Sequence, residues 1–126
     1  MDALFDRVGG ERFFVELVDQ FYIGVAGDPL LRPLYPDDLS ESRRHLALFL
    51  MQYWGGPSTY NEERGHPRLR MRHAPFVVGP GERDAWLRHM RSAVDHMVQS
   101  EHLTMADADE LRGYFTMAAN SLVNTR

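Results

Sequence analysis

The sequence predicts an all-α fold, arranged as a single domain over residues 1–126. Three observations carry this prediction. Apolar residues recur at helical spacing through nearly the whole chain, Gly and Pro interrupt that spacing at intervals typical of helices, and no strand pattern is present. The one candidate strand, FVVG at 76–79, is too short and too isolated.

Two strongly amphipathic helices are expected in the first half of the chain. The segment 11–26 carries an apolar stripe that follows the i, i+4, i+8 spacing of a helix facing a core. The segment 40–54 repeats this spacing. Ser40 is its expected N-cap, and a Gly-Gly-Pro sequence at 55–57 is its expected stop.

The middle of the chain is expected to be less regular. Residues 57–66 are polar and predict a loop of ten residues, longer than most connections and therefore a candidate functional loop. Pro67 is expected to open a short helix that ends at His73 or Ala74, because proline suits the first turn of a helix.

Two further helices complete the prediction of four main helices and one short one. A long helix is expected over 82–98, after the Gly-Pro-Gly break at 79–81. Thr104 with Asp107 resembles a capping box and is expected to open the last helix.

Composition narrows the function classes. With no cysteine, disulfides, thiolate metal sites and cysteine nucleophiles are excluded. No apolar run approaches the length of a membrane span and no secretory leader opens the chain, so a cytoplasmic protein without membrane contact is expected. The net charge of −4 argues against nucleic acid as a partner.

The basic stretch GHPRLRMRHAPF at 65–76 allows three interpretations: a nucleic-acid patch, a metal site, or a cationic collar around an anionic cofactor. No aromatic residue lies between Arg68, Arg70 and Arg72, although aromatic platforms usually accompany single-strand binding. We interpret Arg68 as part of a solvated face. Arg70 or Arg72 can pair with a carboxylate, such as the propionate of a porphyrin.

His73 closes this short helix after a long loop. A lone histidine near apolar residues is more often structural than a ligand. Here, however, the flanking Met71, Phe76 and Val77 suit a segment that stands beside a flat cofactor, and a neutral imidazole is a common axial ligand of haem iron.

Three aromatic residues with polar tips also permit two interpretations. Tyr22 and Trp86 lie on the apolar stripes of their helices, and Tyr35 lies in the PLYPDD corner. They are either core residues bonded to the backbone or donors that converge on a small ligand. His89 and His96, seven residues apart, fit a solvated face better than a metal site.

Over residues 4–124 the chain resembles the truncated haemoglobins of the second group. Four sequence blocks carry the resemblance: QFYIGVAGDPLLRPLYP at 20–36, LFLMQYWGGPSTY at 48–60, RGHPRLRMRHAPF at 64–76 and ERDAWLRHM at 82–90. The resemblance implies a two-over-two helical sandwich that holds haem b. It implies His73 as the proximal iron ligand and a distal ligand pocket formed by Tyr22, Tyr35, Ser42, Leu46 and Trp86.

The resemblance also implies a wider set of cofactor contacts. His45 occupies the propionate-facing position, where relatives often carry arginine. The cofactor-binding residues implied in total are His73, Tyr22, Tyr35, His45, Leu46, Phe49, Leu50, Arg72, Phe76 and Trp86.

The leading functional hypothesis is therefore a haem protein that reversibly binds O₂, CO, NO or related small ligands. The alternative is a haem redox enzyme, a peroxidase or a nitric oxide dioxygenase, supplied with electrons by a separate reductase. A third hypothesis is a colourless helical module that binds an acidic partner through the arginines, with steep salt dependence. A homo-oligomer is compatible with each.

Overall fold

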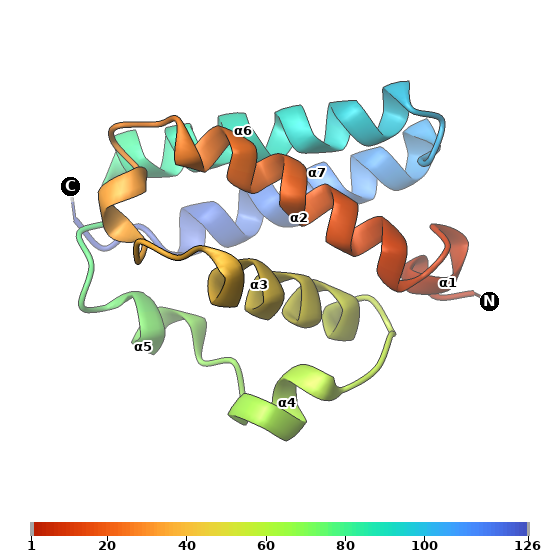
Figure 1. Cartoon of the computed structure of the whole chain (residues 1–126), viewed down its shortest axis with the longest axis horizontal. Helices are drawn as coiled ribbons and strands as arrows, with labels where there is room; N and C mark the ends of the chain where they lie inside the picture. Colours follow the sequence, from red (N-terminus) through yellow and green to blue (C-terminus); the bar gives the residue numbers. More distant parts are fainter. Residues whose placement is uncertain (1, 126) are drawn as a thin grey trace.

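The computed structural model describes residues 2–125, and within this range all regular structure is helical, as predicted (Figure 1). No helix in this range has the length and apolar character needed to cross a membrane. The elements are α1 (Leu4–Arg7), α2 (Glu11–Ala26), the 3₁₀ helix η1 (Arg32–Leu34), α3 (Ser40–Tyr53), α4 (Thr59–Arg64), α5 (Leu69–His73), α6 (Pro80–Gln99) and α7 (Met105–Ser121).

The long helices form two pairs. Helix α2 packs against both α3 and α6, and α6 packs against α7, so that the α2–α3 pair lies over the α6–α7 pair (Figure 1). This is the expected two-over-two sandwich. The short helices α4 and α5 lie beyond α3, where a mostly irregular stretch returns the chain to α6 (Figure 1).

The core lies between these pairs and follows the predicted apolar stripes. All seven stripe residues of α2 are buried: Phe13, Phe14, Leu17, Val18, Phe21, Tyr22 and Val25. Helices α6 and α7 contribute Met90, Val94, Leu111 and Phe115, each at most 2% exposed. Since burial of one large apolar side chain contributes roughly 1.5–3 kcal/mol, this continuous cluster is the main stabilising feature of the fold.

The prediction of a loop over 57–66 is wrong, because residues 59–64 form α4. Tertiary contacts with α3 account for the difference. Tyr60 is buried and its ring lies 5.6 Å from that of Phe49. Glu63 accepts two hydrogen bonds of 2.6 Å from Arg44. The segment therefore becomes helical by docking on α3 rather than through an apolar stripe of its own.

The structure confirms some of the predicted helix ends and contradicts others. Ser40 is not an N-cap but the first residue of α3, and its N–H donates to Asp38 Oδ1 at 2.9 Å. Helix α6 begins at Pro80, two residues earlier than predicted, since proline is well suited to the first helical position. Thr104 caps α7 as predicted, with its hydroxyl accepting from the Asp107 N–H at 3.2 Å. Helix α1 and η1 were not predicted.

Glycine permits the close approach of α1 to the end of α3. Gly55 has a φ of +93°, a conformation that favours glycine, and a Cβ at this position would meet Ala3. The neighbouring Phe5 N–H donates to the Trp54 carbonyl at 3.1 Å. These contacts close the end of the sandwich opposite to α5 (Figure 1).

Candidate functional site

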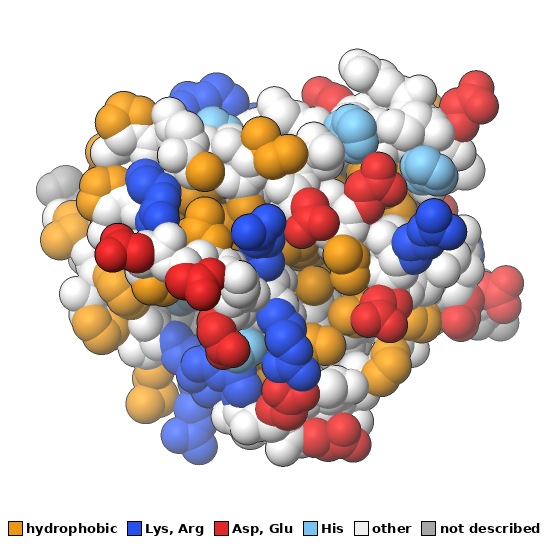
Figure 2. All heavy atoms as spheres, in the orientation of Figure 1, with side chains coloured by type: hydrophobic (Ala, Val, Ile, Leu, Met, Phe, Trp, Pro, Cys, Tyr) orange, Lys and Arg blue, Asp and Glu red, His pale blue; other side chains and the backbone are white. Residues whose placement is uncertain are grey.

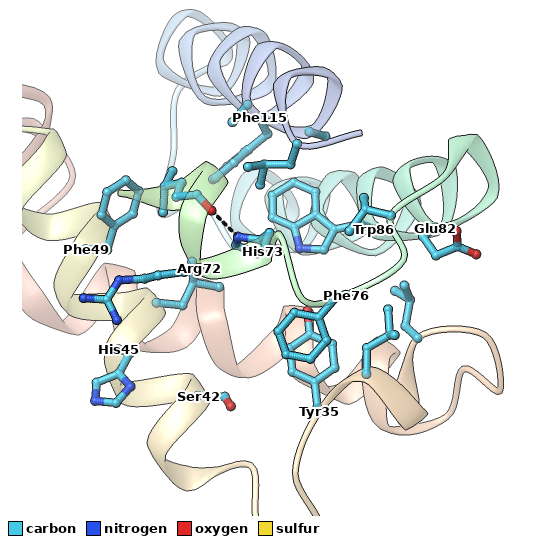
Figure 3. Close-up of a pocket in the computed structure, with 18 of the residues that line it drawn as sticks. Tyr35, Ser42, His45, Phe49, Arg72, His73, Phe76, Glu82, Trp86 and Phe115 are labelled. Atoms are coloured by element: carbon cyan, nitrogen blue, oxygen red, sulfur yellow. Dashed lines mark hydrogen bonds between the residues drawn. The ribbon is translucent and has the colours of Figure 1, made fainter. Parts of the chain in front are cut away.

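A cavity of about 500 Å³, with a mostly apolar lining, lies between α3, α5, α6 and α7. Further lining residues come from α2, from α4 and from the corner at 31–36, so segments far apart in the sequence meet at this cavity (Figure 3). All residues that the sequence analysis assigned to the site line this one cavity: Tyr22, Tyr35, Ser42, His45, Leu46, Phe49, Leu50, Arg72, His73, Phe76 and Trp86.

His73 is held in a defined orientation at the end of α5. Its Nδ1–H donates to the Leu69 carbonyl one turn earlier, at 2.7 Å (Figure 3). This bond fixes the tautomer, because a carbonyl can only accept. In the neutral imidazole, Nε2 is then the nitrogen without a proton, and its lone pair is free to bind a metal.

The segment after His73 is pinned by the C-terminal stretch. The Asn124 side-chain amide donates to the carbonyls of His73, at 3.3 Å, and Phe76, at 3.0 Å, and its oxygen accepts from the Val78 N–H at 2.9 Å. Asn124 was missed by sequence analysis. The nearest of these three partners lies 46 residues away in sequence, and no local pattern predicts such a contact.

A cluster of polar-tipped aromatics, Tyr22, Tyr35 and Trp86, lines the cavity. Tyr22 is 5% exposed, and its ring packs edge-on against that of Tyr35, with 5.6 Å between centroids. Trp86 packs on Phe21, at 5.3 Å, and Phe115, at 5.9 Å. The polar groups of this cluster therefore come from α2, from the end of η1 and from α6, which meet only in the folded chain.

Burial keeps both hydroxyls protonated. It raises the pKa of Tyr22 far above its ordinary value, an effect to which Tyr35 adds and which Arg43 opposes. Burial also raises the pKa of Tyr35 to about 12, opposed by a hydrogen bond with Trp86. At neutral pH both phenols are hence available as hydrogen-bond donors, while the indole N–H of Trp86 donates to Tyr35.

Helix α3 supplies one long wall of the cavity. Ser42, His45, Leu46, Phe49 and Leu50 follow the i, i+3, i+4 spacing and all face it. The residues near the middle of the helix are apolar, whereas Ser42 and His45 belong to its first two turns. This wall is thus polar at one end and apolar further along.

Cationic groups meet at the cavity rim. Arg64 donates to His45 Nδ1 at 2.7 Å, and His45 Nε2 lies 3.4 Å from Glu41. Desolvation and the neighbouring Arg64 lower the pKa of His45. Arg72 lines the cavity, but its guanidinium also donates to two backbone carbonyls, those of Pro67 at 2.7 Å and Arg64 at 3.1 Å.

Arg64 was not among the predicted site residues, because it closes a helix that was expected to be a loop. Several further lining residues were missed as well, and most lie on segments whose cavity-facing side only packing determines. They are Leu31, Leu34, Pro36, Tyr60, Leu69, Val78, Glu82, Arg83, Tyr114, Phe115, Ala118, Ala119 and Leu122.

His89 is not on a solvated face, contrary to prediction. Its side chain is 17% exposed, and its Nε2–H donates to Asp28 Oδ2 at 2.6 Å. Asp28 also accepts from the N–H of Leu30 at 2.9 Å, and these bonds hold the pKa of its carboxyl below the usual range. The Asp28–His89 hydrogen bond links the corner after α2 to helix α6. Tyr35 lies further along this corner, and Trp86 lies on α6.

His96 does remain partly exposed, 3.4 Å from Glu16. Within residues 2–125 no group of three or more His, Asp or Glu side chains is arranged to hold a metal ion.

Comparison with known proteins places these features in one family. A family model described as bacterial-like globin matches residues 3–120. The group 2 truncated hemoglobin YjbI of Bacillus subtilis (strain 168) is 51% identical over 88 residues, which cover 70% of this chain and 67% of the relative.

Solved structures agree over nearly the full length. The group II truncated hemoglobin from Bacillus anthracis has a TM-score of 0.92 and 39% identity, covering 99% of this chain and 98% of the other. A truncated oxygen-avid haemoglobin from Bacillus subtilis has a TM-score of 0.90 and 42% identity, covering 98% of this chain and all of the other.

Proposed function

Since the chain belongs to the bacterial-like globin family, as a truncated haemoglobin of the second group, we propose that its cavity holds haem b and receives O₂ and other diatomic ligands. One observation carries the proposal: an imidazole with a fixed tautomer lines an apolar cavity of about 500 Å³. That volume falls within the range of small-molecule sites.

The residues present fit such a cofactor. In its neutral form, His73 would bind the haem iron through Nε2, and the Leu69 carbonyl that accepts from its other nitrogen is the outer partner that metal-bound histidines usually have. The bound haem supplies an iron with an open position for a small ligand. The apolar walls exclude water, and the His45–Arg64 pair offers positive charge to the propionates at the rim.

We assign Tyr22, Tyr35 and Trp86 as the donors to a ligand opposite His73. Two observations support this assignment: all three residues line the cavity, and both phenols keep their protons at neutral pH. Preorganised donors in a dry site stabilise a partly anionic ligand more strongly than water does. Ser42 and Leu46 complete this ligand pocket. Ser42 adds a minor polar contact, and Leu46 limits the space available to the ligand.

Hemin titration tests the proposal. The wild-type protein should take up one hemin and give a sharp Soret band that shifts on reduction and again with CO. His73→Ala should lose most of its hemin affinity, and added imidazole should restore the band. His102→Ala, at a side chain 56% exposed, is the matched control and should behave as wild type. An unchanged spectrum in His73→Ala would refute the axial assignment.

A second candidate function is a redox enzyme, a peroxidase or a nitric oxide dioxygenase. The contact between Tyr22 and Tyr35 beside the cavity favours it, because buried phenols can supply electrons and protons to a bound oxidant. This function needs electrons from an external reductant. Peroxide turnover well above that of free hemin would support it, and turnover equal to free hemin would rule it out.

A further inference from the structure

Positive charge is concentrated in residues 64–81. This range holds four arginines and no Asp or Glu, whereas the whole chain has 14 basic and 18 acidic residues. The rest of the chain therefore carries ten arginines against 18 acids, a net charge of −8, beside a segment of +4. Arginine side chains gather at the lower left of Figure 2, close to α4 and α5.

The arginines of this segment are not neutralised by the fold. Within residues 2–125, none of Arg64, Arg68, Arg70 and Arg72 has a carboxylate within 4.0 Å: Arg64 contacts His45, and Arg72 donates to backbone carbonyls. Six arginines elsewhere do have such a partner, namely Arg7, Arg43, Arg44, Arg83, Arg88 and Arg112. Arg12, Arg32 and Arg91 also have no carboxylate partner within residues 2–125, but they lie far apart in the sequence. This segment differs because four such arginines fall within residues 64–72, with no acidic residue after Arg64 until Glu82.

Exposed apolar side chains lie among these arginines. Met71 is 66% exposed, Phe76 43% and Val77 63%. Arg, Met and aromatic residues are the types enriched at protein interfaces. Together with the four arginines, these three residues define what we call the basic surface. Its composition fits a protein with acidic side chains around an apolar centre.

The basic surface adjoins the cavity. The five-residue helix α5 carries both Leu69 and His73, which line the cavity, and Arg70 and Met71, which are exposed. A helix with its side chains is about 10–12 Å across. A partner seated on Arg70 and Met71 would therefore lie about one helix diameter from the cavity.

We propose that the basic surface docks an acidic electron-carrier protein, which reduces the haem of this chain. The inference rests on the proposed function. In the step, the carrier is oxidised by one electron and the ferric iron of the bound haem is reduced to ferrous; no bond or proton moves. Complexes between electron-transfer proteins have small, weak interfaces, and complementary charge on the two proteins raises their association rate.

The test uses the hemin-loaded protein and a fully reduced flavodoxin, an acidic one-electron donor. In Arg68→Glu/Arg70→Glu the second-order rate constant of haem reduction should fall at least tenfold at low salt. In wild type, the rate should also fall as ionic strength rises from about 0.01 to 0.1 M, where the screening length shortens from about 30 to 10 Å. Arg12→Glu/Arg91→Glu, with the same charge change on exposed residues outside the surface, should stay within twofold of wild type.

A second readout is independent of turnover. Oxidised flavodoxin carrying a fluorescent dye should gain anisotropy with wild type and with the Arg12/Arg91 control, but not with the Arg68/Arg70 variant. Hemin uptake and reduction by dithionite should be unchanged in every variant.

The outcomes separate the two proposals. Equal reduction rates in the two double variants, with hemin bound, would overturn the docking surface alone. Binding to anionic lipid vesicles but not to flavodoxin would overturn it in favour of a membrane surface. A wild-type chain that takes up no hemin would overturn the proposed function, and the electron-transfer role with it.

Discussion

Replacing Gly24 with alanine should destabilise the protein, although the same change in most helix interiors is stabilising by about 1 kcal/mol. Gly24 lies in the middle of α2, and a Cβ there would lie 2.8 Å from Cγ of His89 and closer still to Nδ1. The imidazole has little freedom to move, since it is 17% exposed and bonded to Asp28 at 2.6 Å.

The magnitude follows from two opposing effects. Forcing an extra methyl group into packed structure costs about 1–3 kcal/mol. The constraint on His89 favours the upper part of this range, and the helix-propensity gain offsets about 1 kcal/mol. We therefore expect a net loss of about 1–2 kcal/mol in the free energy of unfolding, measured by urea denaturation of the hemin-loaded protein with far-UV circular dichroism.

Gly113→Ala is the matched control. Gly113 lies within α7, is exposed, and has no atom within 4 Å of an added Cβ, so alanine should stabilise the protein there by about 1 kcal/mol. In a His89→Ala background the obstruction is gone, and Gly24→Ala should also become stabilising. If Gly24→Ala stabilises the wild-type protein as Gly113→Ala does, the packing argument is wrong.

Three further predictions concern the site and its supporting pair. Trp86→Phe should raise the O₂ dissociation rate of the reduced, haem-loaded protein by about fivefold or more, since one donor contributes about 1–3 kcal/mol; an unchanged rate would remove Trp86 from the donor set. Hydrogen bonds lower the pKa of Asp28, so its carboxylate stabilises the fold above its unfolded pKa and this contribution is lost as pH falls through the folded pKa. The stability gap between wild type and Asp28→Asn in urea titrations should hence narrow in acid, and a pH-independent gap would contradict this. Burial raises the pKa of Tyr35 to about 12, above its unfolded value of 10.0, so stability should fall between those two pH values, and less so in Tyr35→Phe; equal alkaline losses would argue against a buried phenol.

Several residues that line the cavity could be selected from the sequence, because the patterns that point to them lie within single segments. His73 ends the short helix that the sequence predicts, although this helix begins at Leu69 and not at the predicted Pro67. Tyr22 and Trp86 lie on helical stripes whose phase fixes which side faces inward. Tyr35 and Ser42 entered through resemblance alone. The structure brings all of them to one cavity, while their roles toward a ligand remain the subject of the experiments above.

The rim was harder to predict. Arg70 or Arg72 was expected to pair with a propionate. Arg70 is exposed and is not among the residues that line the cavity, and the guanidinium of Arg72 donates to the backbone of 64–67. Arg64 contacts His45 at the rim. The folding of 59–64 into α4 decides this arrangement, since it places Arg64 beside α3. Nothing in the local sequence reports that docking.

The sequence by itself determined the all-α class and the apolar faces of the long helices, because helical periodicity is a local property of each segment. Only the tertiary structure decided α4, the buried His89–Asp28 pair and the Asn124 anchor. Each depends on partners that are distant in the sequence: 19 residues separate Arg44 from Glu63, and 61 separate Asp28 from His89. Such contacts form only when packing brings the partners together, and they then override the weak local preference of a polar segment or a single histidine.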